Sequence, residues 1–274
     1  MTGAALSFTA QAPDKPRSSN APSPDESGDG LSPSIESAAP HAESALEQVE
    51  KEVERIFEVA KLSVVQIKAI RQTAMPPLAV GTGFFVDAEG SILTSSQIVS
   101  DSNENDIQVI WNGRKYDARR VGFDPRTNLA LLKIPAAGTP PLKWGDSDKI
   151  RMGSLVIGVG FPSSSGVCPE VGNVSSVDLG LLMKYFATSH IRTTVRVVDG
   201  QAGSPLLNSR GEVVGMIVAA DTDSSHSYAL PASAIKKIQP DLVKFHQPQY
   251  GFVGIGINEV TADEKGNPLP APKV

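Results

Sequence analysis

The four histidines are the side chains of this sequence best suited to acid–base chemistry near neutral pH. His41 lies in a polar amino-terminal tail, and His246 ends a predicted helix. His226 lies in a polar loop, and His190 lies in a predicted strand, where its ring should face solvent. A serine next to a histidine makes a nucleophile. A relocated pair such as Ser204 with His226 is therefore one enzymatic hypothesis.

Other reactive or metal-binding side chains are sparse. Cys168 is the single cysteine, which excludes an internal disulfide and a multi-cysteine zinc site, and it is interpreted as a small strand residue. No cluster of His, Cys and Asp has metal-ligand spacing, so we predict neither a metal nor a cofactor. Asp124 precedes a proline and is interpreted as a turn residue. The glycines of 158–162 are not followed by a helix, which argues against dinucleotide binding.

Composition excludes two classes of partner. The chain has 274 residues, with 25 Lys and Arg against 30 Asp and Glu, a net charge of -5 and a pI near 5.4. It lacks the basic footprint of a nucleic-acid-binding protein. No apolar run approaches the ~20 residues that a membrane-spanning helix needs. A chain of this length forms one or two domains.

Residues 1–44 form a tail rich in Ser, Pro, Ala, Asp and Glu, which we expect to be disordered because it has too little apolar surface to bury. Residues 1–12 end in an Ala-Gln-Ala pattern like that of a signal-peptide cleavage site, although the positive region of a complete signal is missing. This stretch is either a signal remnant or ordinary tail. The first alternative favours the cell envelope or secretion over the cytoplasm.

Residues 45–62 are predicted to form an amphipathic helix, because apolar residues recur from Leu46 to Ala60 at spacings of three and four. The helix packs either on its own domain or on a neighbouring subunit. Residues 63–249 are predicted to be β-structure closed by a helix over Ala232–Phe245, because short apolar runs alternate with turn signals. The runs are Val64–Ile67, Gly83–Val86, Ile107–Trp111, Leu129–Ile134, Leu155–Gly160, Val213–Val218 and Tyr228–Leu230.

Four segments together resemble the trypsin-like serine proteases of the HtrA/DegP (Do-like) type. In order along the chain they are Gly81–Val99, Asp124–Ile134, Leu142–Pro162 and Gly200–Ile217. The resemblance implies an all-β fold, a chymotrypsin/trypsin-like double β-barrel over residues 63–249 with a cleft between the barrels.

The same segments differ from the family at the three positions of the catalytic triad. Thr-Asn-Asn-His-Val of the family becomes Thr-Ser-Ser-Gln-Ile, so Gln97 stands where the resemblance places the general base. Asn128 stands in place of the orienting aspartate, and Ala202 in place of the nucleophilic serine. An amide does not shuttle protons near neutral pH, and a methyl group has no lone pair. The sequence therefore predicts no catalytic residues.

The peptide-binding parts of the family are backbone groups, which persist when side chains change. The resemblance places the oxyanion-hole N–H groups at Gly200 and Ala202, although Val198-Asp199 replaces the usual Asn-Pro before them. It places the strand that pairs with substrate at Val218, Ala219 and Ala220. An extended peptide would add there as a β-strand.

Residues 250–274 begin like the first strand of the family's PDZ domain but are too few to complete one. We interpret them as a truncated PDZ start or a carboxy-terminal extension.

Three hypotheses follow. The first is an inactive HtrA-like pseudoprotease that binds unfolded or extended polypeptide, or a partner subunit, in its cleft. The second is an active serine endopeptidase with a rearranged site. The third is a structural or regulatory subunit, in a homo-trimer or in a hetero-oligomer with an active homologue.

Overall fold

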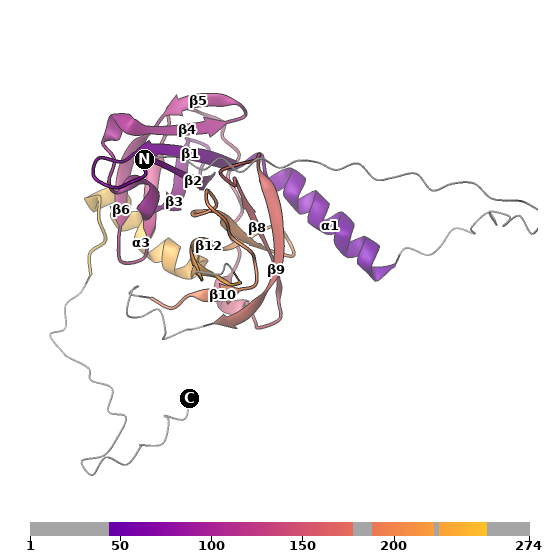
Figure 1. The fold of residues 1–274 in the computed structure, drawn as a ribbon. Helices are drawn as coiled ribbons and strands as arrows, with labels where there is room; N and C mark the ends of the chain where they lie inside the picture. Colours follow the sequence, from indigo (N-terminus) through magenta and orange to yellow (C-terminus); the bar gives the residue numbers. More distant parts are fainter. Residues whose placement is uncertain (1–43, 178–187, 222–224, 251–274) are drawn as a thin grey trace, which may run out of the picture. The chain divides into compact units, whose positions relative to one another are not determined.

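The computed structural model describes residues 44–177, 188–221 and 225–250, and these form two β-barrels with three helices (Figure 1). The trypsin-like double β-barrel inferred from the resemblance is confirmed. The expectations for tail 1–44 and extension 250–274 fall almost entirely outside the described residues.

The first barrel is a seven-stranded antiparallel sheet in the order β5-β4-β1-β2-β3-β7-β6. A tight turn at Asn112 and Gly113, both with positive φ, joins β4 to β5 as the Asn-Gly signal predicts. The strands are β1 (Val64–Ile70), β2 (Leu78–Phe85), β3 (Ser91–Ser95), β4 (Ile107–Trp111), β5 (Arg114–Asp117), β6 (Arg119–Asp124) and β7 (Leu129–Lys133).

The second barrel is closed, in the order β10-β13-β12-β11-β8-β9. The segment around Trp144 leads into it, and the ring centroids of Trp144 and Phe84 of the first barrel lie 6.4 Å apart in an edge-on contact. The strands are β8 (Leu155–Gly160), β9 (Cys168–Val177), β10 (Ile191–Thr193), β11 (Pro205–Asn208), β12 (Val213–Ala220) and β13 (Ser227–Pro231).

Short helices flank the barrels. α2 (Ser96–Val99) follows β3 directly, α3 (Ala232–Phe245) follows β13, and two 3₁₀ turns, η1 (Glu104–Asp106) and η2 (Ser147–Lys149), lie in loops. Within the described ranges, no helix has both the length and the apolarity that a membrane span requires.

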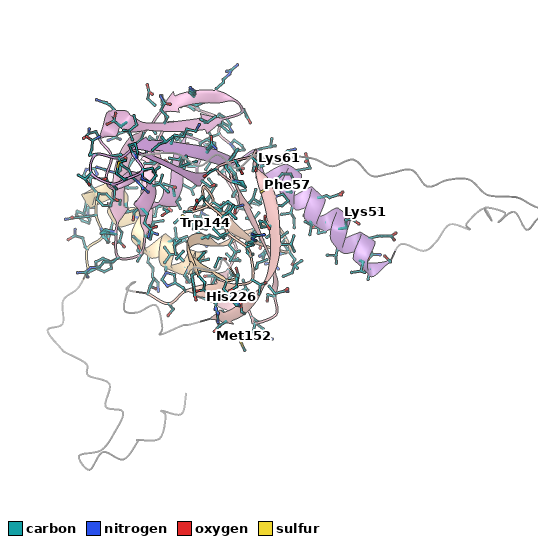
Figure 2. All side chains as sticks on the ribbon, viewed as in Figure 1. Lys51, Phe57, Lys61, Trp144, Met152 and His226 are labelled. Carbon is teal, nitrogen blue, oxygen red and sulfur yellow. The ribbon has the colours of Figure 1, made fainter. Side chains whose placement is uncertain are left out.

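Helix α1 (Ala45–Ala60) begins with a capping box between Ser44 and Glu47. Only its carboxy-terminal half meets the barrels, through the buried side chains of Ile56 and Ala60. Phe57 lies at that end, whereas Lys51 lies farther out along the helix (Figure 2).

Each barrel has its own apolar core, and a third apolar cluster joins them. Val65, Ile67 and Phe85 belong to the first core, and Val156 and Leu206 to the second. The joining cluster includes Phe84, Ile157, Met216 and Leu230, together with Ile56 of α1. Because this shared cluster is buried, the two barrels and the ends of α1 and α3 are held as one packed body.

The backbones of the two barrels are in direct contact at residues 202–203. The Thr82 N–H donates to the Ala202 carbonyl at 2.9 Å, and the Gly203 N–H donates to the Ile217 carbonyl at 2.8 Å. Gly203 has φ +89°, and a Cβ there would lie 2.2 Å from the Thr82 carbonyl oxygen. Only glycine fits this junction, both in conformation and in space.

We expect Gly203→Ala to destabilise the protein by at least ~2 kcal/mol more than Gly153→Ala, because overpacking adds to backbone strain. Gly153 is the matched control, since it also has a positive φ, +83°, but open space around its Cβ position. Denaturant unfolding of the two variants measures the difference. Equal losses would show that the crowding against Thr82 is relieved at no cost.

Candidate functional site

An open groove of about 760 Å³ runs between the two barrels. It brings together Gln97, Gly200, Ala202 and the Val218–Ala220 strand, which the sequence analysis singled out one by one. The groove is lined by Arg71, Pro76, Leu78, Ala79, Val80, Gln97, Ile98, Ser163, Val197, Val198, Asp199, Gly200, Ala202, Ile217, Val218, Ala219, Ala220 and Asp221.

Asn128 lies beneath this groove, 1% exposed, and bridges the two barrels. Its Oδ1 accepts hydrogen bonds from the Ser95 and Ser96 hydroxyls, at 2.8 and 3.0 Å, and from the Gln97 N–H at 3.0 Å. Its Nδ2 donates to the Val218 carbonyl at 2.8 Å. The last bond requires a donor, which an ionised carboxylate lacks. The amide therefore suits this site better than the acid.

The loop that carries Ala202 presents free backbone donors. Gly200 has φ +96°, and its carbonyl accepts a hydrogen bond from the Thr82 hydroxyl at 2.8 Å. Among the described residues, neither the Gly200 N–H nor the Ala202 N–H has an acceptor, and both residues line the groove. Two such N–H groups side by side suit a carbonyl oxygen or an oxyanion.

The described lining of the groove lacks a nucleophile and a base that could work as a pair. Gln97 is exposed at its surface, and Ser163 is the one hydroxyl among the described lining residues. No imidazole or thiol occurs among those same lining residues. Ala202 lines the groove and has no side-chain atom that could attack a carbonyl.

Strand β12 offers an open edge to this groove. The Asp221 N–H donates to the His226 carbonyl at 2.9 Å, on the side of β13. Ladder bonds alternate along an antiparallel strand, so Ala219 also bonds toward β13, whereas Ala220 turns its N–H and carbonyl to the other edge. Ala220 is exposed, and it lines the groove. One residue of an extended peptide fits against it.

The structure separates the relocated pair considered from sequence. The Ser204 hydroxyl is buried and donates to the Gln201 carbonyl at 2.7 Å. The His226 ring instead lies within 3.1 Å of the Arg192 guanidinium and 3.5 Å of the Asp221 carboxylate. Ser204 and His226 therefore engage different groups, and their hydrogen bonds give no support to a nucleophile–base pair.

The prediction that His190 faces solvent was wrong. Its ring is fully buried just before β10, in a pocket shared with Ile150 of the η2 loop and Ala234 of α3. Alternation in a single strand does not reveal that other elements cover it. Burial lowers the pKa of His190, because desolvation disfavours the imidazolium.

The contacts of Cys168 and Asp124 indicate roles in the fold and not in a reaction. Cys168 begins β9, as the sequence indicated, and its sulfur accepts from the Gln201 side chain at 3.7 Å. Burial raises the pKa of this thiol, so it is a poor nucleophile. Asp124 is buried and accepts from the Thr127 and Tyr250 hydroxyls, as well as from the Arg126 N–H. That pattern is an Asx turn pinned by Tyr250.

Comparisons with known proteins agree with this geometry. The trypsin-like peptidase domain matches residues 81–216. A probable periplasmic serine endoprotease DegP-like of Chlamydia trachomatis is 30% identical over 187 residues, 67% of this chain. One of Pseudomonas putida with the same description is 32% identical over 189 residues, 68% of this chain. This chain belongs to the HtrA/DegP-like trypsin-fold proteins.

Solved HtrA-type structures share the fold. A variant of the HtrA-type protease AlgW with a tripeptide superposes with a TM-score of 0.71 at 24% identity, covering 77% of this chain and 70% of that one. The serine endoprotease from Yersinia pestis gives 0.61 at 25% identity, covering 71% and 68%. The present chain spans only 37% to 39% of the HtrA/DegP-like relatives from Chlamydia trachomatis and Pseudomonas putida.

The HtrA/DegP resemblance did not point to the first-barrel wall of the groove. Arg71, Pro76 and Leu78 line it from the end of β1, the following loop and the start of β2. The exposed apolar residues of this loop, including Met75 and Leu78, are the signal that could have located it.

We expect Asn128→Asp to destabilise the protein by about 1–3 kcal/mol at neutral pH, because the Val218 carbonyl would face a carboxylate oxygen instead of a donor. The carboxylate keeps the acceptor role toward Ser95, Ser96 and Gln97. Denaturant unfolding at fixed pH measures the loss. An Asp variant as stable as the parent would show that the bond to Val218 contributes nothing.

We expect stability to fall as the pH drops below about 6.5, the ordinary pKa of histidine. Since the pKa of His190 is lowered in the fold, the unfolded chain binds more protons in the window between the two values, and acid favours it. Above that pH window, the contribution of His190 to the free energy of unfolding does not change with pH. The pH dependence of the unfolding free energy should be weaker in His190→Asn, and an unchanged slope would contradict the assignment.

Proposed function

We propose that this chain is a non-catalytic HtrA/DegP-like protein that holds unfolded or extended polypeptide in the groove between its barrels. The observation that carries the proposal is the Ala202 loop. Gly200 and Ala202 line the groove with N–H groups that have no acceptor among the described residues, and Ala202 carries a methyl in place of a nucleophile.

The binding features form a consistent set. A peptide carbonyl placed at the Gly200 and Ala202 N–H groups lies beside the open β12 edge, where Ala220 supplies one donor and one acceptor. Main-chain bonds of this kind give affinity with little dependence on sequence. The small side chains of Ala202 and Ala219 leave room for an aliphatic residue.

The absence of catalysis follows from the same residues. In a worked serine-protease case, changing only the triad aspartate to asparagine costs about 10⁴ in rate. Here Gln97 and Ala202 also lack the proton-transfer and nucleophilic functions. The relatives named above are serine endoproteases by name. We propose that this chain keeps their fold and groove but does not perform their reaction, and that it works in the cell envelope or outside the cell.

A second candidate function is that of a structural or regulatory subunit. It would form either a homo-trimer or a hetero-oligomer with an active homologue. The observation that favours it is the outer half of α1, where Leu46 is 81% and Val49 is 48% exposed. Co-purification with an active homologue would support this role.

Labelled, unfolded casein mixed with the purified protein tests the main proposal. We expect fluorescence anisotropy to rise and then hold for hours, because casein is bound but not cut. A fall below the value of free casein would reveal cleavage and favour an active, rearranged site. No change would exclude general peptide binding.

We expect Ala220→Pro to weaken casein binding at least ~10-fold, because proline removes the N–H that the open edge offers. Ala220→Gly is the control, since it changes the side chain at the same position but keeps the N–H. Titration of labelled casein against both variants gives the two affinities. Equal affinities would argue that the peptide does not pair with Ala220.

A further inference from the structure

The charged side chains that line the groove are divided between its two walls. Arg71 comes from the first barrel, and Asp199 and Asp221 come from the second. Neither Arg71 nor Asp199 forms an ion pair within the described part of the chain. These two charges are available to a ligand.

Arg71 lies at the outer end of the first-barrel wall. Its N–H donates to the Pro77 carbonyl at 2.7 Å, so it is held beside the start of β2 at Leu78. Thr82, four positions further along β2, is bonded to Ala202 at the centre of the site. At about 3.3 Å per strand residue, Arg71 stands roughly 13 Å from that centre. The Asp101 carboxylate accepts hydrogen bonds from the backbone N–H groups of Ala74 and Thr73, which together with the charge of Arg71 lower its pKa.

Asp221 lies at the outer end of the other wall. Ile217 is bonded to Gly203 at the centre, and Asp221 follows it by four positions along β12, again roughly 13 Å away. Its carboxylate accepts from the Tyr228 hydroxyl at 2.8 Å and lies 3.6 Å from the Arg192 guanidinium. Arg192 also contacts His226 at 3.1 Å. Together with Asp199, the second-barrel wall has two carboxylates, Asp199 and Asp221, and one neighbouring guanidinium, that of Arg192.

The direction of β12 predicts which end of a bound peptide lies near each of these charged side chains. Every strand pair in the second barrel is antiparallel. A peptide that pairs with β12 in the antiparallel direction has its amino-terminal end toward Asp221. Its carboxy-terminal end then runs past Ala202 toward Arg71. β2 belongs to the first barrel and β12 to the second, and we place the two charged ends on opposite sides of the junction on that basis.

We infer that the groove selects extended segments of about eight residues with a basic amino-terminal end, a small aliphatic centre and an acidic carboxy-terminal end. This inference rests on the proposed peptide-binding function and adds a direction and a charge pattern to it. The aliphatic centre contacts Val197, Ile217 and Ala219, which bind without fixing a direction. The charges at the ends fix it, because the reversed sequence would place like charges together.

Three labelled octapeptides of matched length and matched central residues test the inference, and two of them have the same composition. The forward peptide is Lys-Lys-Ala-Val-Val-Ala-Glu-Glu, the reverse is Glu-Glu-Ala-Val-Val-Ala-Lys-Lys, and the neutral peptide has Gln at the four end positions. Exposed ion pairs are individually weak, so we expect forward to bind about 10-fold tighter than reverse, with neutral between them. The difference should disappear in ~1 M salt, where charges are screened beyond about 3 Å.

Two variants assign the effect to its residues. Arg71→Glu should remove or reverse the preference, and Asp221→Asn should reduce it while keeping an acceptor for Tyr228. Lys115→Glu is the control, since it makes the same charge change on exposed β5 outside the groove and should leave the preference intact.

The outcomes separate this inference from the proposed function. If all three peptides bind equally and compete with casein, the polarity is wrong and the peptide-binding function stands. If neither the peptides nor casein binds, both are wrong. If the reverse peptide binds best, the strand direction or the assignment of the two ends is overturned.

Discussion

The structure depends on one buried amide, because Asn128 is the point at which the two barrels share hydrogen bonds beneath the groove. Its oxygen holds the turn that starts α2 in the first barrel, and its nitrogen holds the Val218 carbonyl of β12 in the second. An aspartate could satisfy only the first set. The chain therefore has, at the position where a protease needs a negative charge, a group whose neutrality and donor are used to join the barrels. On the non-catalytic function that we propose, the same amide that joins the barrels also occupies the position of the charged triad member.

Peptide binding and catalysis place different demands on the groove, so the proposed function needs only the first set. Catalysis requires particular side-chain atoms at three positions, whereas strand addition and carbonyl capture require only backbone in the right conformation. That conformation is enforced locally. Gly200 and Gly203 have positive φ, Thr82 is hydrogen-bonded to both the Gly200 carbonyl and the Phe161 N–H, and Gly203 is packed against the Thr82 carbonyl. None of these constraints involves the side chains at the triad positions, except through Asn128.

The sequence predicted what depends on local pattern and on recognisable motifs. The barrel fold, the exact span of α3, strands β4 and β8, and the gathering of Gln97, Gly200, Ala202 and Ala220 in one groove all followed from it. It did not predict what depends on contacts between distant segments. The burial of His190 arises from the η2 loop and α3, and the donor role of Asn128 arises from Val218, ninety positions away. The position of Arg71 in the groove wall depends on the conformation of the following loop, which no sequence motif predicts.

The open edge of β12 gives a reason to expect that the groove is occupied. An exposed strand edge invites non-specific pairing, and proteins usually cover it or blunt it with charge. Here the edge at Ala220 lies inside a cleft, with Asp221 beyond it and the exposed Val198 and Asp199 beside it. A strand edge inside a groove is less accessible to another folded sheet than to a single extended chain. On the charge pattern that we propose, the charges at the two ends both blunt the edge and select the peptide, because a segment with the wrong pattern would meet like charges at both walls. Selectivity and protection from aggregation would then depend on the same few side chains, and neither would require a catalytic residue.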